Sequence, residues 1–261
     1  MPALDPRRKA ELIVELFRGR RPTEILPPDL YPASLAEAYA IRRCFQEVEE
    51  ATGRGAIAGY KIGLTTPVMQ RLCGIAEPCY GAIFKTEVHN RRAELSSVDY
   101  CRLGIETEIV FRLGDDLPHG NDAARVAAAV ESAAAAIELL EDLRYDYRRL
   151  DAAAMVAGNV WNAGVVCAAP VKGWRALDLA RVTARLSIND REIGSGVGRD
   201  VMGHPLNALA WLAQKLADEG TPLRSGMMVM TGSMVPIQHP VAGDRVLVEV
   251  SGLGAVELVL T

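Results

Sequence analysis

The sequence predicts an α+β fold, in which a curled, mostly antiparallel β-rich body follows a helical appendage at the N-terminus. Residues 1–53 show helical apolar periodicity, whereas residues 54–261 contain many short strand-like runs interrupted by single helices. Helices and strands do not alternate as they do in βαβ units, which argues against a doubly wound parallel sheet. With 261 residues, we expect a single domain over 1–261, made of a helical segment at 1–53 and a β-rich body at 54–261.

Charge and hydropathy exclude several classes of partner. The chain has 29 basic and 33 acidic residues, so its net charge of −4 predicts neither nucleic-acid nor membrane binding. No uninterrupted apolar run approaches the roughly 18 residues of a membrane-spanning helix. The opening residues 1–6 lack the apolar core of a signal peptide, and we therefore expect a cytoplasmic location.

Cysteine and histidine spacing argues against a zinc or disulfide protein. The five cysteines are scattered without a C-x-x-C pair, and the four histidines have no ligand-like spacing. Reduced, mostly buried thiols are the expected state. A metal, if present, would need oxygen ligands, which favours Mg²⁺ or Mn²⁺ over zinc.

Two helices are predicted before the body. The first covers residues 5–18, with Pro6 in its first turn and Gly19 at its end. A capping box at residues 34–37 starts the second, which Gly53 terminates. A proline-rich link separates them, and the pair could serve as a lid or an oligomer contact.

The body begins with a strand at residues 55–64 that contains a single lysine, Lys61. A buried lysine needs a carboxylate or an anionic ligand nearby. An edge strand with Lys61 in water is the alternative, and the residues alone leave both open. A short helix at 66–72, a turn at 77–81 and a strand at 82–84 follow.

Two carboxylates, Glu106 and Glu108, lie inside a strongly apolar strand at residues 104–111. Because strand side chains alternate between faces, both point to the same side, roughly 6.5 to 7 Å apart. Like charges at this separation raise each other's pKa unless a bound cation reverses the balance. A polar face in contact with water is the other interpretation.

The rest of the chain is predicted as strands separated by two helices. An alanine-rich helix is expected at 122–136, and residues 137–143 could extend it or form a strand with Glu138 and Asp142 on one face. A glycine-rich segment at 194–198 is a weak phosphate-loop candidate, and Ser233 has no recognisable His or Asp partner for nucleophilic catalysis. The other expected elements are strands at 160–167 and 182–188, a helix at 205–218, and strands at 227–231, 245–251 and 255–260.

Several motifs together resemble the fumarylacetoacetate hydrolase superfamily. They are GYKIGLT at 59–65, MQ at 69–70, EPCYG at 77–81, GIETEI at 104–109 and MGHP at 202–205. Within the superfamily the sequence is most similar to the branch of 2-keto-4-pentenoate hydratases and 4-oxalocrotonate decarboxylases. The likeness extends over nearly the whole chain, and the ordered set of motifs is more specific than any one of them.

The resemblance implies a site in the β-rich body, which would then be catalytic. Glu106 and Glu108 match the family's E-x-E metal ligands and Glu138 its third carboxylate, with Mg²⁺ as the expected cofactor and Mn²⁺ as the alternative. Lys61 matches the active-site lysine. The residues expected to border the substrate are Leu64, Asn159, Trp161 and Ser233.

Two departures from the family pattern concern the proton-transfer end of the site. Cys79 stands where hydratases usually have an aspartate, so we consider it a candidate catalytic residue, with an inert buried thiol as the alternative. Residues 157–161 read AGNVW where the family has ADNAS, which places a bulky indole at Trp161. The pocket is therefore expected to differ in shape.

The resemblance further implies a metal-dependent lyase of 2-oxo acids or their dienol forms in aromatic catabolism. Hydration of a 2-hydroxydienoate is the first expectation. The alternatives are 2-oxo acid decarboxylation, C–C hydrolysis of acylpyruvates, and a non-catalytic partner subunit. A homo-oligomer is expected, with a complex with another enzyme of the same pathway as a further expectation.

Overall fold

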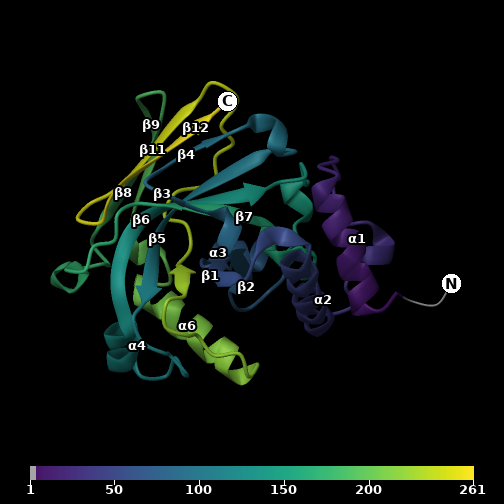
Figure 1. Ribbon diagram of the computed structural model, residues 1–261, viewed down its shortest axis with the longest axis horizontal. Coiled ribbons are helices and arrows are strands. Elements are labelled where there is room, and N and C mark those ends of the chain that lie inside the picture. Colours follow the sequence, from purple (N-terminus) through teal and green to yellow (C-terminus); the bar gives the residue numbers. More distant parts are fainter. Residues whose placement is uncertain (1–3) are drawn as a thin grey trace.

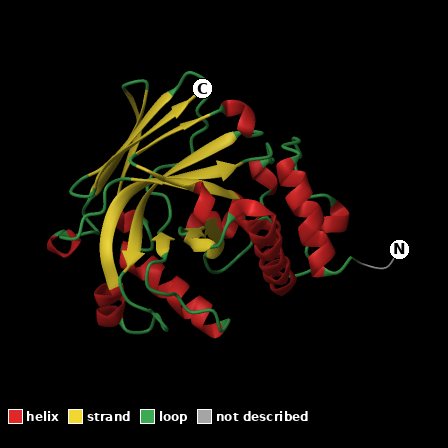
Figure 2. Cartoon of the chain, viewed as in Figure 1, coloured by secondary structure: helices red, strands yellow, loops and turns green. Residues whose placement is uncertain are grey.

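The computed structural model describes residues 4–261 and contains a seven-stranded and a five-stranded sheet with helices around them (Figure 2). The predicted α+β class is confirmed, with the β-structure divided between two curled sheets. Residues 1–3, part of the opening segment used above, lie outside the described residues.

The two predicted N-terminal helices are present as α1 (Pro6–Arg18) and α2 (Leu35–Glu49), which pack together at one end of the molecule (Figure 1). The capping box also forms: the Glu37 N–H donates to Ser34 Oγ at 3.1 Å, and the Glu37 carboxylate accepts from the Ala33 N–H at 2.7 Å. Helix α2 contacts the short helix α5 (Ala152–Ala157), which joins the appendage to the body.

The seven-stranded sheet holds the long strands β5 and β6 at its centre. Its order is β2-β1-β10-β5-β6-β7-β3, and β1 pairs with β10 in parallel, as β3 does with β7. The bounds are β1 Ile57–Gly63, β2 Cys79–Phe84, β3 Val88–Asn90, β5 Leu103–Leu113, β6 Val130–Glu141, β7 Asn162–Cys167 and β10 Met228–Met230.

The five-stranded sheet lies at the opposite end from α1 and α2, at the upper left of Figure 1. Its order is β4-β12-β11-β8-β9, and β4 pairs with β12 in parallel. The bounds are β4 Arg92–Leu95, β8 Thr183–Ile188, β9 Arg191–Val197, β11 Arg245–Val250 and β12 Gly254–Leu260. The remaining α-helices are α3 Pro67–Leu72, α4 Ala123–Ala129 and α6 Pro205–Asp218.

Three sequence-based assignments were wrong in detail. The alanine-rich helix ends at Ala129, and the following alanines belong to β6, so residues 137–141 are a strand. The strand expected from 160 begins at Asn162, and the turn expected over 77–81 already enters β2 at Cys79. Strand β9 occupies most of the glycine-rich segment, which removes the phosphate-loop candidate. Along residues 4–261, helices long and apolar enough to cross a membrane are absent.

Candidate active site

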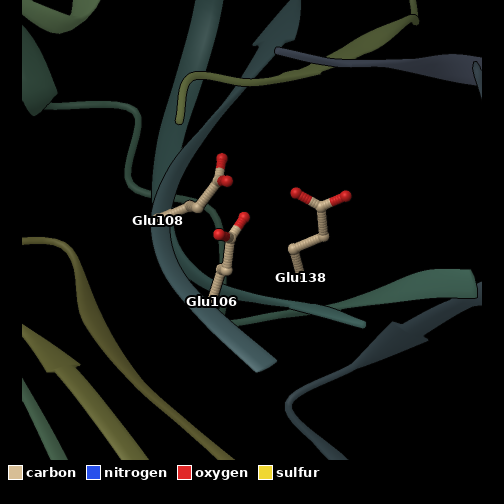
Figure 3. Close-up of side chains that lie close together, drawn as sticks. All are labelled: Glu106, Glu108 and Glu138. Carbon is tan, nitrogen blue, oxygen red and sulfur yellow. The ribbon is translucent and has the colours of Figure 1, made fainter. Parts of the chain in front are cut away.

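The register of β5 and β6 brings three carboxylates together. Glu106 pairs directly with Glu138 across the antiparallel ladder, and Glu108 lies two residues further along β5. Directly opposed strand residues share a face, so all three side chains point to the same side. One oxygen from each lies within 4.8 Å of the others, and Figure 3 shows Glu138 facing the two glutamates of β5.

These carboxylates are largely removed from water, contrary to the interpretation of a wet strand face. Glu108 and Glu138 are fully buried, and Glu106 is partly buried. Burial raises the pKa of Glu106 to about 7, although the Lys61 ammonium acts in the opposite direction. Burial and the charges of Glu138 and Glu106 also raise the pKa of Glu108.

Lys61 provides a cation for this cluster. Strand β1 lies between β2 and β10, so Lys61 is on an interior strand, and its Nζ is 3.0 Å from Glu138 Oε1. Burial acts to lower the pKa of Lys61, but the charges of the three glutamates outweigh it and raise that pKa. Of the two interpretations, the buried, paired lysine is therefore the one that the fold adopts.

The donor set fits a hard divalent cation. Two buried oxygens, Glu108 Oε1 and Glu138 Oε2, have no hydrogen-bond partner among residues 4–261. Unpaired buried carboxylate oxygens are costly unless a cation binds them. With all three carboxylates ionised, as metal ligands are, the cluster and the Lys61 ammonium would carry two excess negative charges, which one divalent ion would balance.

A cavity of about 470 Å³ opens beside the carboxylates. Five of the predicted site residues line it, namely Lys61, Leu64, Glu106, Trp161 and Ser233. The Ser233 hydroxyl donates to the Val235 carbonyl at 2.6 Å and accepts from the Thr107 N–H at 3.1 Å. These bonds fix the chain that follows β10 along the cavity.

Cys79 and Asn159 do not line this cavity. Cys79 is fully buried, and burial raises the pKa of its thiol to about 12, so it is not an activated nucleophile. The Asn159 amide is bonded to the backbone N–H and carbonyl of Ala82 at 2.7 and 2.9 Å. The geometry gives no support to the predicted substrate contact of Asn159, because its polar atoms hold strand β2.

Sequence reasoning missed three contributors to the site. Asn162 donates to Glu138 Oε1 at 2.9 Å, and the Gly232 N–H donates to Glu108 Oε2 at 2.8 Å. Tyr147 lines the cavity, and its hydroxyl donates to the buried Asp142 at 2.9 Å. Asn162 carried a usable signal, since an amide at the start of an apolar strand needs a partner when it is buried.

Residues 87–261 match the family model described as fumarylacetoacetate (FAA) hydrolase C-terminal. The chain belongs to the fumarylacetoacetate hydrolase family. The family expected from the motifs is therefore confirmed, and two of the five motifs, GIETEI at 104–109 and MGHP at 202–205, lie in the matched region.

Known relatives lie in the same branch. A 2-keto-4-pentenoate hydratase of Paraburkholderia phymatum is 32% identical over 84% of this chain and 83% of its own length. A 2-hydroxyhexa-2,4-dienoate hydratase of Comamonas testosteroni is 30% identical over 94% of this chain and 95% of its own. Among solved structures, 4-oxalocrotonate decarboxylase of Pseudomonas putida G7, complexed with magnesium and adipate, matches with TM-score 0.90 and 25% identity, covering 98% of this chain and 97% of that one.

Proposed function

We propose that this chain is a divalent-metal-dependent lyase that adds water to the dienol form of a 2-oxo acid. The observation that carries the proposal is the convergence of three carboxylates, two of them fully buried, and Lys61 beside a largely apolar cavity. Curated relatives named as hydratases support the same reaction class.

Glu106, Glu108 and Glu138 would hold the ion, and Mg²⁺ is our first choice, with Mn²⁺ as the alternative. Solved relatives are complexed with magnesium in one case and with calcium in another. When bound, such an ion supplies Lewis-acid stabilisation of negative charge that develops on a substrate oxygen.

The chain's own residues bind and orient the substrate. Lys61 stays protonated because the surrounding carboxylates raise its pKa, so it attracts a substrate carboxylate and holds it at this end of the cavity. The apolar walls exclude bulk water from the diene, which strengthens these electrostatic contacts. Hydration then needs a proton at the far end of the diene and water at C4.

Decarboxylation of a 2-oxo acid is the second candidate, favoured by the fold match to 4-oxalocrotonate decarboxylase and by Cys79 in place of an expected acid. Turnover of 2-hydroxypenta-2,4-dienoate with Mg²⁺ would support the hydratase. Release of CO₂ from 2-oxohex-3-enedioate would support the decarboxylase, and metal binding without turnover of either would support a partner subunit.

The single-domain organisation, the homo-oligomer, the pathway complex and the cytoplasmic location stay predictions.

Replacing Glu108 tests the metal assignment. In Glu108→Gln the amide oxygen can still accept from the Gly232 N–H, so the fold is expected to persist while one anionic ligand is lost. We expect activity to fall at least 100-fold, in line with the about 10–100-fold effect of weaker changes around metal ligands.

The stabilisation of the protein by added Mg²⁺ or Mn²⁺, measured by thermal unfolding, should also disappear in Glu108→Gln. Glu131→Gln, at an exposed position of the same β6 strand that holds Glu138, is the control and should behave as wild type. Full activity of Glu108→Gln, or an unchanged metal-induced shift of its melting temperature, would contradict the assignment of Glu108 as a metal ligand.

A further inference from the structure

The cavity lining combines a few charged groups with a mostly apolar wall. Lys61 and Glu106 provide charge at one end, next to the carboxylate cluster. The wall beyond them is formed mainly by aliphatic, aromatic and thioether side chains, among them Leu140, Met155 and Ile237. A ligand held by its acid group at the charged end would therefore place the rest of its structure against apolar surface.

Two aromatic rings form part of this apolar wall. Trp161 is 5% exposed and stacks on Tyr145, with ring centroids 4.7 Å apart and an interplanar angle of 9°. Tyr147 meets the Trp161 ring edge to face at 6.4 Å and 82°. Because Tyr147 is also bonded to the buried Asp142, both rings are held in place before any ligand binds.

A second cationic anchor is missing from the described lining of the cavity. Its ionisable side chains are Lys61, Glu106 and the exposed Asp200, together with the neutral Tyr147 hydroxyl. Arg102 is not among the lining residues; its guanidinium is 5.7 Å from the Tyr147 ring centroid and pairs with Asp142. A carboxylate at the far end of a ligand would lose its hydration without gaining an ion pair.

The volume exceeds what the smallest dienol acids need. At about 30 Å³ per water molecule, a cavity of about 470 Å³ has room for roughly 15 waters. A five-carbon 2-hydroxydienoate would fill only about half of that space. Empty apolar surface beside a short substrate gives no binding energy, whereas a larger apolar group would bury it.

We propose that the substrate carries an uncharged apolar group, alkyl or aryl, at the end remote from its 2-oxo acid. The inference rests on the proposed function, because the 2-oxo acid is taken to bind at the Lys61 and Glu106 end. It assigns the surface around Leu140, Trp161, Tyr147 and Ile237 as a subsite for that group. Dicarboxylic 2-oxo acids are thereby excluded as preferred substrates.

Binding of three saturated 2-oxo acids, which cannot be hydrated, tests the subsite by titration calorimetry in the presence of Mg²⁺. The acids are 2-oxopentanoate, 2-oxo-5-phenylpentanoate and 2-oxohexanedioate. We expect the phenyl compound to bind at least about tenfold more tightly than the other two, since even one extra methylene in an apolar pocket gives about 10-fold or more. Equal or tighter binding of the dicarboxylate, or no gain from the phenyl group, would overturn the inference.

A charge placed in the subsite gives a second, independent readout. Ile237→Lys puts an ammonium group on the cavity wall and should improve 2-oxohexanedioate binding at least about tenfold while weakening the phenyl compound. Val241→Lys, at a 65% exposed position in the same loop, is the matched control and should change neither. If none of the three acids binds to the wild-type protein, the proposed function itself is refuted. Turnover assays with dienol acids test the proposed function separately.

Discussion

Lys61 and the three glutamates of the candidate site form an unbalanced buried cluster. The ammonium is 2% exposed and contacts Glu138, while Glu108 has one oxygen without a partner among residues 4–261. Removing one member of a buried ion pair leaves its partner uncompensated and costs far more than breaking a surface pair. Lys61 is therefore expected to stabilise the metal-free protein as well as to bind substrate.

Lys61→Met tests this stabilising role. Methionine fills a similar volume without charge, so we expect the free energy of unfolding to fall by about 3–5 kcal/mol in metal-free protein, measured by urea denaturation. Lys215→Met is the control, because Lys215 Nζ pairs at 2.9 Å with the partly exposed Glu77. That substitution should cost no more than about 1 kcal/mol. Equal losses in the two variants would contradict the role.

At the scale of single residues, the sequence predicts which neighbouring side chains share a strand face, but not which groups from distant segments contact them. The i, i+2 spacing of Glu106 and Glu108 placed both on one face, as β5 confirms. Glu138 was identified only through the family resemblance, because strand register is set by contacts between distant segments. The hydrogen bond from the Gly232 N–H to Glu108 could not have been predicted, because every residue except proline has a backbone N–H.

Among the elements, the turn between α5 and β7 has the most strained backbone near the site. Asn159, Val160 and Trp161 have φ angles of 55°, 50° and 60°, which are unfavourable for residues with side chains and most of all for a β-branched valine. The turn places Trp161 on the cavity wall and leads directly to Asn162, which holds Glu138. Strain is thus retained where it orients site residues.

Gly81 allows this turn to approach strand β2. A Cβ at position 81 would lie 2.3 Å from the Asn159 carbonyl oxygen, so Gly81→Ala must displace the turn. We expect a loss of about 1–3 kcal/mol in unfolding free energy, measured by urea denaturation, and weaker binding of 2-oxo acids. Gly173→Ala, where no atom lies within 4 Å, should stay within about 0.5 kcal/mol. If the turn is displaced but the affinity for 2-oxo acids is unchanged, the turn does not position the site.

The alanine-rich segment shows why one element was assigned wrongly. Alanine favours helices, and residues 123–129 do form α4. From Val130 onward the same composition becomes β6, because that strand is paired on both sides, with β5 and with β7, and is buried on both faces. Such a central strand lacks the alternating pattern by which strands are recognised, and tertiary pairing overrides the local preference.

Across the whole molecule, the helical appendage and the β-rich body share buried contacts. Phe45 of α2 is 2% exposed and packs edge to face against Phe17 of α1, within a cluster that also contains Ala157 of α5. Gln46 of α2 donates to Asn159 Oδ1 at 3.4 Å. Arg42 donates to the Tyr80 hydroxyl at 2.7 Å, which connects α2 to β2. These contacts support the prediction that residues 1–53 and 54–261 fold as one domain.

Phe45→Ala distinguishes one cooperative unit from two. Truncation of a buried phenylalanine costs about 3–5 kcal/mol, which for a chain of this size lowers the melting temperature by about 6–15 °C. If appendage and body form one unit, calorimetry should show a single transition that shifts as a whole, and metal-induced stabilisation should move with it. Val98→Ala, at a 76% exposed position, should leave that transition in place. Two transitions, of which only one responds to Phe45→Ala, would show that the helices unfold separately from the body that holds the site.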